Sequence, residues 1–504
     1  MSRLLVRSGK DPFTPVGPET TLAQDVFNSN SGNYLFQHSV WRALALDGAE
    51  LVSSSTLSER RTPEKGDAER INGEFDHFVI PLANAFRPEF EPNLARLTDL
   101  VEQLTIPVTV VGVGSQAPFG AEPATLEAID ATVSRFVAAV LERSASIGVR
   151  GEFTARHLAR LGFGDDVVEV IGCPSLFLWG PDHRVARRAD VIDAHAPLAL
   201  NLTPEVPGVG RFASRQAQRH PRLVYVGQDA HDLRLLAWGR PHPHVTDPDV
   251  PVHLHHPLYQ EDRMRLFLDT WTWYDALREQ HLVYGTRFHG NVAGLLAGTP
   301  SVLLAHDSRT LELAEYHRMP HRVVAAFDDA AADVQADDLH AEADLDAFHA
   351  ALPEGFDRFT SFLERNGLEH RWSTDATGEG FDHALATATF PPAVRPLVAR
   401  DGGEVAARLR WLREGMVLDL TRHPQRYDAP FPHPEWKGAG TGYRRMQRRN
   451  DRLHERHARR MDATEKQLAR TEADLAVLRR RVTDLENTLA RRLVRRLKRW
   501  LRRG

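Results

Sequence analysis

The stretch His281–Pro300, HLVYGTRFHGNVAGLLAGTP, decides the fold that we expect for this chain. It opens with the apolar run Leu282–Tyr284, which predicts a buried strand. A helical pattern follows, closed by a glycine and a proline, and a second apolar run comes at residues 301–304. This is the pattern of one βαβ unit. Ligands of open parallel sheets bind at the carboxyl ends of the strands, so Arg287 and His289 are predicted to lie at a binding site.

Two interpretations of this pair stay open from the stretch alone. An arginine holds anions, and a histidine titrates near neutral pH, so Arg287 and His289 together suit an anionic substrate beside an acid or base. The same side chains also suit structural roles. Arg287 could pair with a carboxylate of the chain, and His289 could cap a helix or fill the core.

Length and composition bound the class of protein. At 504 residues the chain is too long for one core, and its 42% apolar and 26% charged residues are typical of a soluble protein. Its one cysteine, Cys173, excludes an internal disulfide and a site of several thiolates, which fits a reducing compartment. We see no secretory signal and no apolar run long enough to span a membrane. A cytoplasmic protein is therefore expected.

Strands alternate with helices as far as about residue 330, which predicts an α/β fold of two Rossmann-like domains with parallel sheets. We expect an N-terminal α/β domain at 1–180 and a C-terminal α/β domain at 190–330 that carries the Arg-x-His site. Residues 331–440 are a helical and linker region. A coiled coil is expected at 445–490 and a basic amphipathic helix at 491–504.

The last two segments predict separate partners. Leucine or valine recurs every seven residues from Leu468 to Leu489, which favours a coiled coil and through it a homo-oligomer. The end of the chain, RRLVRRLKRWLRRG, combines arginine with an apolar face, which is typical of helices that bind anionic membrane surfaces. A solvated basic end is the alternative. No specific nucleic-acid partner is expected, because no recognised binding fold is present.

Other strand tips and helix starts offer further candidates for the site. Small polar residues including Gly32 and Asn33 precede a helical pattern, and free N–H groups at a helix start hold anions. Gly114, Ser115 and Gln116 follow the apolar strand at residues 106–113. A plain helix cap and a plain tight turn are the alternatives for these two places.

Charged residues lie at several more strand ends. Arg150 follows the short strand at 146–149, and Asp229 and Asp307 follow two strands of the second domain. The loop 242–259 is rich in histidine, but its spacing matches no closed metal site, so no metal is predicted.

In these motifs the chain resembles the polysaccharide pyruvyl transferase family over roughly residues 25–330. Many members carry Asp-Pro where this chain has Cys173-Pro174, and a lysine where it has Asp307-Ser308-Arg309. The resemblance rests on Ser31-Gly32-Asn33, Gly112–Gln116, Ser146–Arg150, Val170–Pro174, Gly285–Gly290 and Leu296–Pro300.

The resemblance implies a glycosyltransferase-B-like fold and transfer of a pyruvyl group from phosphoenolpyruvate to a sugar of a surface polysaccharide or its lipid-linked precursor, forming a ketal. It implies no cofactor beyond this donor. Arg287 and Arg150 would hold the phosphate and carboxylate, with N–H groups near Gly32 and Gly114. His289 would protonate the enol carbon. Asp229, Asp307 or Glu312 would assist as a base.

Two other functions stay open at this point. The first is a glycosyltransferase that uses a sugar nucleotide on a similar scaffold. The second is a non-catalytic scaffold docked at a membrane. Because lipid-linked glycans are made at the inner membrane face, the basic end of the chain predicts a peripheral location there.

Overall fold

The computed structural model describes residues 2–406 except 118, 325 and 374–376, together with 408, 427–431 and scattered residues between 466 and 498. Met1–Lys437 form one compact unit and Gly438–Gly504 a second. The predicted coiled coil at 445–490 and basic helix at 491–504 lie mostly outside the described residues. The predicted domain boundaries within the first unit stay a prediction.

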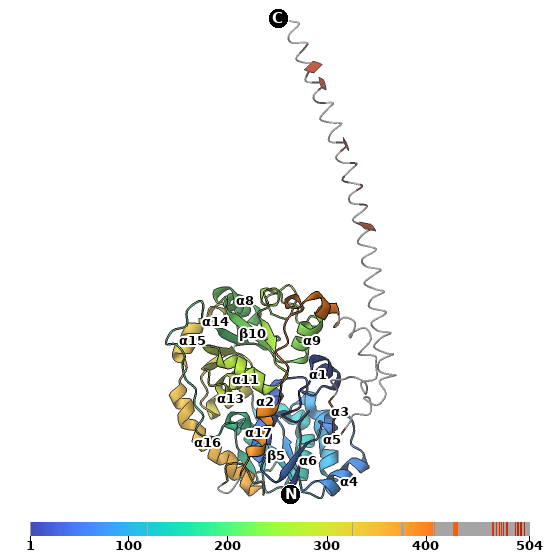
Figure 1. Cartoon of the computed structure of the whole chain (residues 1–504), viewed down its shortest axis with the longest axis vertical. Helices are drawn as coiled ribbons and strands as arrows, with labels where there is room; N and C mark the ends of the chain where they lie inside the picture. The colour runs from blue at the N-terminus through green and yellow to red at the C-terminus, as the bar shows by residue number, and fades with distance from the viewer. Residues whose placement is uncertain are drawn as a thin grey trace. The chain divides into compact units, whose positions relative to one another are not determined.

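Parallel sheets form the framework of the first unit (Figure 1). The first sheet has the order β2 (Ala49–Ser53), β1 (Ser2–Val6), β3 (His77–Pro81), β5 (Val108–Val111). The second has the order β11 (Met264–Leu266), β10 (Leu223–Gly227), β9 (Leu198–Asn201), β12 (Leu282–Gly285), β13 (Ser301–Ala305), β14 (His321–Val323). All these neighbours pair in parallel, which confirms a mixed α/β fold with parallel sheets. The glycosyltransferase-B-like arrangement stays a prediction.

Short strands extend the first sheet. Two further parallel pairs are β4 (Asn84–Phe86) with β6 (Gly114–Ser115) and β7 (Ile147–Val149) with β8 (Val168–Val170). The N–H of Gly112 donates to the carbonyl of Gly148 at 2.9 Å, and the N–H of Arg150 donates to Val113 at 2.9 Å. These bonds attach β7 next to the end of β5, so Arg150 emerges at the carboxyl edge of this sheet.

Each sheet reverses its strand order once. In the first sheet β2 and β3 lie on opposite sides of β1, and in the second β10 and β12 lie on opposite sides of β9. At such a reversal the connections leave toward opposite faces and open a crevice, where ligands of doubly wound sheets bind. The reversals between β1 and β3 and between β9 and β12 are therefore the two expected binding places.

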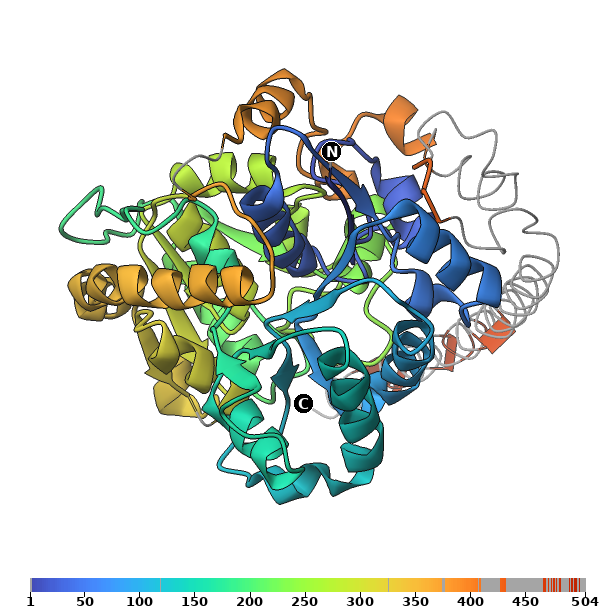
Figure 2. The same ribbon diagram turned by 90° about the horizontal axis from the view of Figure 1, so that it is seen from below.

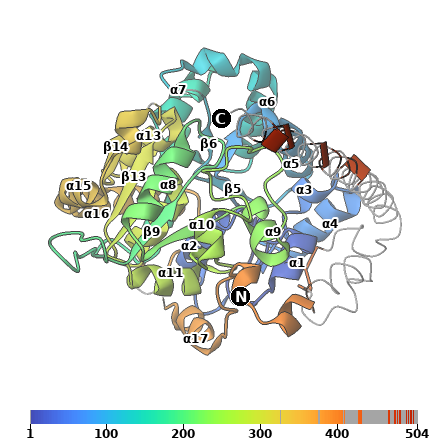
Figure 3. The same cartoon turned by 90° about the horizontal axis from the view of Figure 1, so that it is seen from above.

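Helices cover the sheets on both faces (Figure 3). In the second sheet, alternate side chains of β12 pack in two cores, one with α8 and α9 and the other with α11 and α12. The helices of the first half are α1 (Pro18–Gln24), α2 (Gly32–Leu44), α3 (Leu57–Arg60), α4 (Lys65–Glu74), α5 (Glu91–Val101), α6 (Asp130–Leu141) and α7 (Glu152–Arg160). Those of the second are α8 (Val209–Arg219), α9 (Ala230–Trp238), α10 (Pro257–Gln260), α11 (Thr270–Arg278), α12 (Phe288–Leu296), α13 (Ser308–Tyr316), α14 (Asp329–Ala332) and α15 (Ala336–Glu342).

Helix α2 joins the two halves. Its buried side chains share one core with Val79 of β3 and with Val292 of α12. The loop before it pairs with the loop before α9: the N–H of Ser31 donates to Gln228 O at 2.8 Å, and the N–H of Ala230 donates to Ser29 O at 3.0 Å. We call residues 29–31 the strap.

The segment after the second sheet returns to the first half (Figure 2). In α16 (Leu345–Arg365) the ring of Phe359 stacks on Phe177 with centroids 5.4 Å apart. Helix α17 (Glu379–Thr387) packs Phe381 against Trp271, 6.1 Å between centroids. Sequence patterns predicted helices here but not their positions. No helix among the described residues is both long and apolar enough to cross a membrane.

Candidate active site

Arg287 lies directly after β12, at the reversal of the second sheet. Its backbone N–H donates to Asn201 Oδ1 at 3.0 Å, its Nε donates to the carbonyl of Leu202 at 2.7 Å, and its Nη2 lies 2.5 Å from Asp229 Oδ2. Burial alone would lower the pKa of Arg287, but the carboxylates of Asp229 and Asp232 raise it. The geometry therefore favours the structural alternative, in which Arg287 pairs with a carboxylate of the chain, over the predicted anion holder.

Asp229 is the partner of Arg287 and also the N-cap of α9. Its Oδ1 accepts the N–H groups of His231 at 2.9 Å and Asp232 at 3.0 Å. Burial alone would raise the pKa of Asp229, but Arg287 and the helix N–H groups lower it, so the carboxylate stays ionised. An ionised, paired carboxylate makes a weak base, which speaks against the predicted assisting role of Asp229.

Behind this pair, Asp232 is buried with one oxygen unpartnered. Its Oδ2 accepts the N–H of Gln228 at 2.8 Å, whereas Oδ1 has no hydrogen-bond partner. Burial and the charge of Asp229 raise the pKa of Asp232 to about 7. Near neutral pH Asp232 is therefore protonated in part of the molecules. In those molecules the charges of Asp229 and Arg287 balance, and in the rest there is one extra negative charge.

His289 lies in the first turn of α12 and faces the first half. Its Nε2 is 3.7 Å from Cys173 Sγ. A Cβ at residue 32 would lie 2.9 Å from Cβ of His289, so the space beside this ring requires glycine at position 32. Burial, with the guanidinium groups of Arg150 and Arg309, holds the pKa of His289 well below its ordinary value. The ring is therefore neutral at pH 7 in the free protein.

Gly32 has a different role from the one predicted. Its N–H donates to Asn30 Oδ1 at 2.8 Å, and the next N–H, of Asn33, donates to the carbonyl of Asn30 at 3.1 Å. These N–H groups are used within the chain, so the predicted anion contact at this helix start finds no free donor. Gly32 instead lets α2 approach His289.

Arg150 is a buried arginine whose guanidinium has unpartnered donors. It is 1% exposed, and only its Nη2 donates, to Cys173 Sγ at 3.5 Å. Its Nε and Nη1 are buried without a partner, and the guanidinium lies 4.6 Å from the ring centre of Phe36. A buried cation without a counter-ion is costly, and a bound anion would remove that cost.

Arg309 adds a second positive charge to this place. Its charge lowers the pKa of both Arg150 and His289. Its Nη2 is 3.5 Å from Asp307 Oδ2, and its Nε is buried without a partner. Sequence reasoning noted the run Asp307-Ser308-Arg309 as a departure from the family pattern but did not name Arg309 as part of the site.

Cys173 is the centre of the cluster and was not predicted as a site residue. Its thiol is fully buried, 3.3 Å from Ser175 Oγ, and its backbone N–H donates to His317 Nε2 at 2.7 Å. Burial, with the charges of Arg150 and Arg358, lowers the pKa of His317 to about 3, which keeps this ring a neutral acceptor. The motif Gly-Cys-Pro at a strand end was the available signal.

The glycine-rich tip after β5 is only partly at the site. A Cβ on Gly114 would lie 3.3 Å from Arg150 Cδ, so this glycine makes room for the arginine. Ser115 faces away, with its Oγ 3.2 Å from His157 Nδ1. The side chain of Gln116 accepts a hydrogen bond from Asn84.

The remaining predicted carboxylates hold helix ends. Asp307 caps α13 by accepting the N–H of Thr310 at 2.7 Å, and it reaches the site only through Arg309. Glu312 accepts the N–H of Phe153 at the start of α7 and thereby links the two halves. Neither geometry supports the predicted role of a general base. Asn33 lines a separate cavity at the first sheet.

The histidine-rich loop is held by its own histidines. His256 Nδ1 accepts the N–H of Leu258 at 3.2 Å, and His242 Nδ1 accepts the N–H of Val245 at 3.2 Å. Across the described part of the chain, no group of three or more His, Cys, Asp or Glu side chains is placed to hold a metal ion.

Comparisons with known proteins agree with the sequence motifs. The family model for polysaccharide pyruvyl transferases matches residues 30–308, more than half of the chain. No curated protein matches. Solved structures that resemble the chain include S. aureus MnaA with UDP, at 11% identity and TM-score 0.33, covering 85% of this chain and 100% of that one.

Two more solved structures resemble the chain to a similar degree. UDP-GlcNAc 2-epimerase from Neisseria meningitidis bound to UDP-GlcNAc has 9% identity and TM-score 0.39, covering 73% of this chain and 100% of its own. Anabaena Alr3699/HepE in complex with UDP and glucose has 12% identity and TM-score 0.36, covering 77% and 100%. Scores this low carry no argument about this chain. From the family match, however, the chain belongs to the polysaccharide pyruvyl transferase family and is a transferase.

Proposed function

We propose that the enzyme moves a pyruvyl group from phosphoenolpyruvate onto two hydroxyls of one sugar in a surface polysaccharide or its precursor, forming a cyclic ketal. The observation that carries this proposal is Arg150, a buried guanidinium with two unpartnered nitrogens beside Arg309 and His289. A donor with a phosphate and a carboxylate matches two arginines, since guanidinium groups bind both anions in bidentate fashion.

In the proposed reaction His289 acts first as an acid and then as a base. His289 donates a proton to the methylene carbon of the donor, which becomes the methyl group and leaves the adjacent carbon electrophilic. One sugar hydroxyl attacks that carbon and passes its proton to the neutral imidazole. The second hydroxyl then forms the other C–O bond, the C–O bond to phosphate breaks, and phosphate leaves with the second proton.

The protonation state of His289 depends on the donor. In the free protein Arg150 and Arg309 keep the imidazole neutral. A bound phosphate and carboxylate would offset both cations and favour the charged imidazolium, which raises the pKa of His289. The acid would therefore be formed when the donor arrives. This arrangement would couple formation of the acid to donor binding.

The test is phosphate release from phosphoenolpyruvate by the full-length protein, with and without surface-glycan precursors. We expect release only with an acceptor, loss of release in Arg150→Ala, and a new methyl signal of the ketal in the NMR spectrum of the product. Wild-type protein that neither binds phosphoenolpyruvate nor turns over with any precursor would refute the proposal. Binding of a sugar nucleotide with phosphoenolpyruvate inert would favour the glycosyltransferase alternative.

For the end of the chain, the proposal rests on sequence alone. Residues 491–504 are proposed to bind anionic lipid at the inner membrane face, and residues 445–490 to join copies of the chain through a coiled coil. Deletion from Arg491 should abolish binding to phosphatidylglycerol vesicles at low salt and leave phosphate release intact. Equal vesicle binding by the deleted protein would contradict the membrane role.

A further inference from the structure

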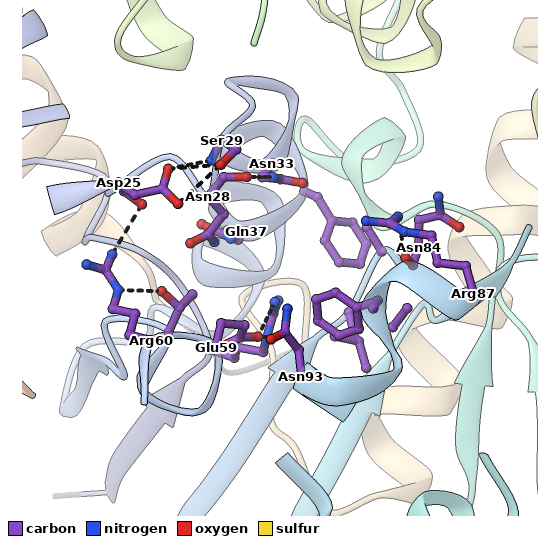
Figure 4. Close-up of a pocket in the computed structure, with 17 residues that line it drawn as sticks. Asp25, Asn28, Ser29, Asn33, Gln37, Glu59, Arg60, Asn84, Arg87 and Asn93 are labelled. Carbon is purple, nitrogen blue, oxygen red and sulfur yellow. Dashed lines mark hydrogen bonds and ion pairs between the residues drawn. The ribbon is translucent and has the colours of Figure 1, made fainter. Parts of the chain in front are cut away.

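A cavity of about 340 Å³ lies at the carboxyl edge of the first sheet (Figure 4). Arg7, directly after β1, and Leu82, directly after β3, both line it. The cavity therefore lies at the reversal of strand order between β1 and β3, where doubly wound sheets bind ligands. Its volume is within the range of small-molecule sites.

Five of the side chains that line the cavity are uncharged amides, and five are charged. Two atoms of the amides are buried without a partner: Asn28 Nδ2, a donor, and Asn84 Oδ1, an acceptor. A hydroxyl group both accepts and donates, so it can satisfy both atoms. Figure 4 shows Asn33, Gln37 and Asn93 around the same space. This is the chemistry of a ligand with many hydroxyls.

The arginines of the lining have partners within the chain. Arg87 donates to the carbonyl of Asn84 at 2.7 Å and lies 3.9 Å from Glu89. Arg7 and Glu59 form an ion pair at 2.5 Å. Arg60 donates to Thr56 Oγ1 at 2.9 Å and to the backbone carbonyls of Gln24 and Asp25 at the end of α1. A phosphate-bearing ligand would need unpaired cations, as at Arg150. The partnered arginines here favour a neutral ligand instead.

Aromatic walls complete the cavity and connect it to the candidate active site. Phe36 and Phe90 both line it, and they offer apolar surface to the C–H faces of a sugar ring. The guanidinium of Arg150 lies over the same Phe36 ring, 4.6 Å from its centre. The cavity and the proposed donor site therefore share Phe36 as a common wall.

The backbone around the cavity is held in an unusual conformation. Asp25, Asn28, Ser29 and Thr56 line the cavity and all have φ between 46° and 62°. Left-handed conformations cost free energy for residues other than glycine, and they persist where the surroundings fix them, often at ligand sites. The cavity rim is thus built in a fixed shape before a ligand arrives.

We propose that this cavity binds the acceptor sugar as a neutral hexopyranose, with Asn28 and Asn84 on its hydroxyls and Phe90 and Phe36 against its ring. The inference rests on the proposed function, because the two reacting hydroxyls must point past Phe36 to the donor at Arg150. The acceptor would then occupy the reversal of the first sheet, and the donor would lie between Arg150 of that sheet and His289 of α12.

The test uses full-length protein and saturation-transfer NMR with methyl β-D-glucopyranoside, galactopyranoside and mannopyranoside as probes. The variants are Asn84→Ala and Phe90→Ala. The matched control is Asn72→Ala in α4, whose side chain donates to Gln103 O at 3.1 Å away from the cavity. Calorimetry with phosphoenolpyruvate is run on every variant, and thermal unfolding checks that each is folded.

We expect at least one glycoside to bind wild type and the control. Its signal should fall about fivefold or more in Asn84→Ala, as for loss of a hydrogen bond worth about 1 kcal/mol, with donor affinity within about twofold of wild type. If Phe90→Ala fails to fold, the result for Asn84→Ala alone decides the test. The inference is overturned if no glycoside binds wild type, if the variants bind like the control, or if both variants lose phosphoenolpyruvate. Failure of the proposed function would appear separately, as a wild type that does not bind phosphoenolpyruvate.

Discussion

The guanidinium of Arg150 lies 3.5 Å from the thiol of Cys173 and makes no other hydrogen bond from its side chain. A thiol is a weak acceptor, so this contact satisfies little of the demand of a buried cation. The sulfur of this pair also lies 3.7 Å from His289 Nε2, and the charge of Arg150 lowers the pKa of His289. An anion bound there would contact all three groups.

Replacing Arg150 should separate binding from stability. Arg150→Ala is expected to weaken phosphoenolpyruvate binding by about 100-fold, since loss of one partner of a buried charge pair costs about 3 kcal/mol. Its free energy of unfolding should stay level or rise, because an unpaired buried cation is removed. Calorimetry and urea titration measure both. Arg135→Ala, an exposed arginine paired with Asp99 and Glu102, serves as the control. Wild-type donor affinity in Arg150→Ala would refute this role.

Replacing Arg287 should lower the stability of the protein more than its affinity for the donor. Arg287→Ala leaves Asp229 buried without its partner and is expected to lower the free energy of unfolding by about 3 kcal/mol. Adding Asp229→Asn should restore part of this loss, as a double-mutant cycle in urea would show. Donor affinity should fall less than in Arg150→Ala. A stable Arg287→Ala variant that has lost the donor would return the anion-holding role to Arg287.

Donor binding should be accompanied by proton uptake. At about pH 7.5 the phosphate of the donor is already mostly ionised, while the lowered pKa of His289 leaves its ring neutral. Binding raises that pKa, so the complex takes up close to one proton. Calorimetry in two buffers of different ionisation enthalpy measures the number. His289→Gln should bind with almost no uptake, and a wild type without uptake would contradict the acid role.

The sole cysteine provides a probe of the occupied site. Cys173 is fully buried, so alkylation by iodoacetamide should be slow, and a bound donor on Arg150 should slow it by about tenfold more. Mass spectrometry follows a single modification, because the chain has one cysteine. Protection should disappear in Arg150→Ala. Equal labelling rates with and without donor in wild type would place the donor elsewhere.

Acid should destabilise the protein partly through His317. Its folded pKa is about 3, against about 6.5 in the unfolded chain. Between these values the unfolded chain binds more protons, so stability falls as pH falls, by up to about 1.4 kcal/mol per pH unit from this ring. His317→Gln keeps an acceptor for the N–H of Cys173. Its urea-derived stability between pH 6 and pH 5 should therefore fall less steeply than that of wild type; equal slopes would exclude the effect.

The local sequence pattern was enough to predict the βαβ unit around Arg287, because the strand and helix periods and the glycine and proline at the helix end lie in adjacent residues. The partner of the Arg287 side chain could not be predicted in this way. Its partner Asp229 lies 58 residues earlier, and only the pairing of β9 with both β10 and β12 brings the two together. The structural alternative was recognised, but the sequence offered no way to choose it.

The same reason explains Cys173 and Gly32. Cys173 follows β8 in the first half, and His289 lies 116 residues further on, so their contact depends on how the halves meet. The small residues before α2 predicted a helix start correctly. Their N–H groups, however, donate to Asn30. The pattern of apolar residues does not indicate which N–H groups already have a partner within the chain.

The strap gives this enzyme a further property. Its bonds to residues 228–230 tie the rim of the cavity to the start of α9, where Asp229 fixes Arg287 at the base of α12. A sugar bound at the rim is therefore linked, through the strap and Asp229, to the helix that carries His289. By thermodynamic reciprocity each substrate should raise the affinity of the other by the same factor. The enzyme would then bind its two substrates cooperatively, so that little phosphoenolpyruvate is bound and exposed to attack by water when no glycan is present.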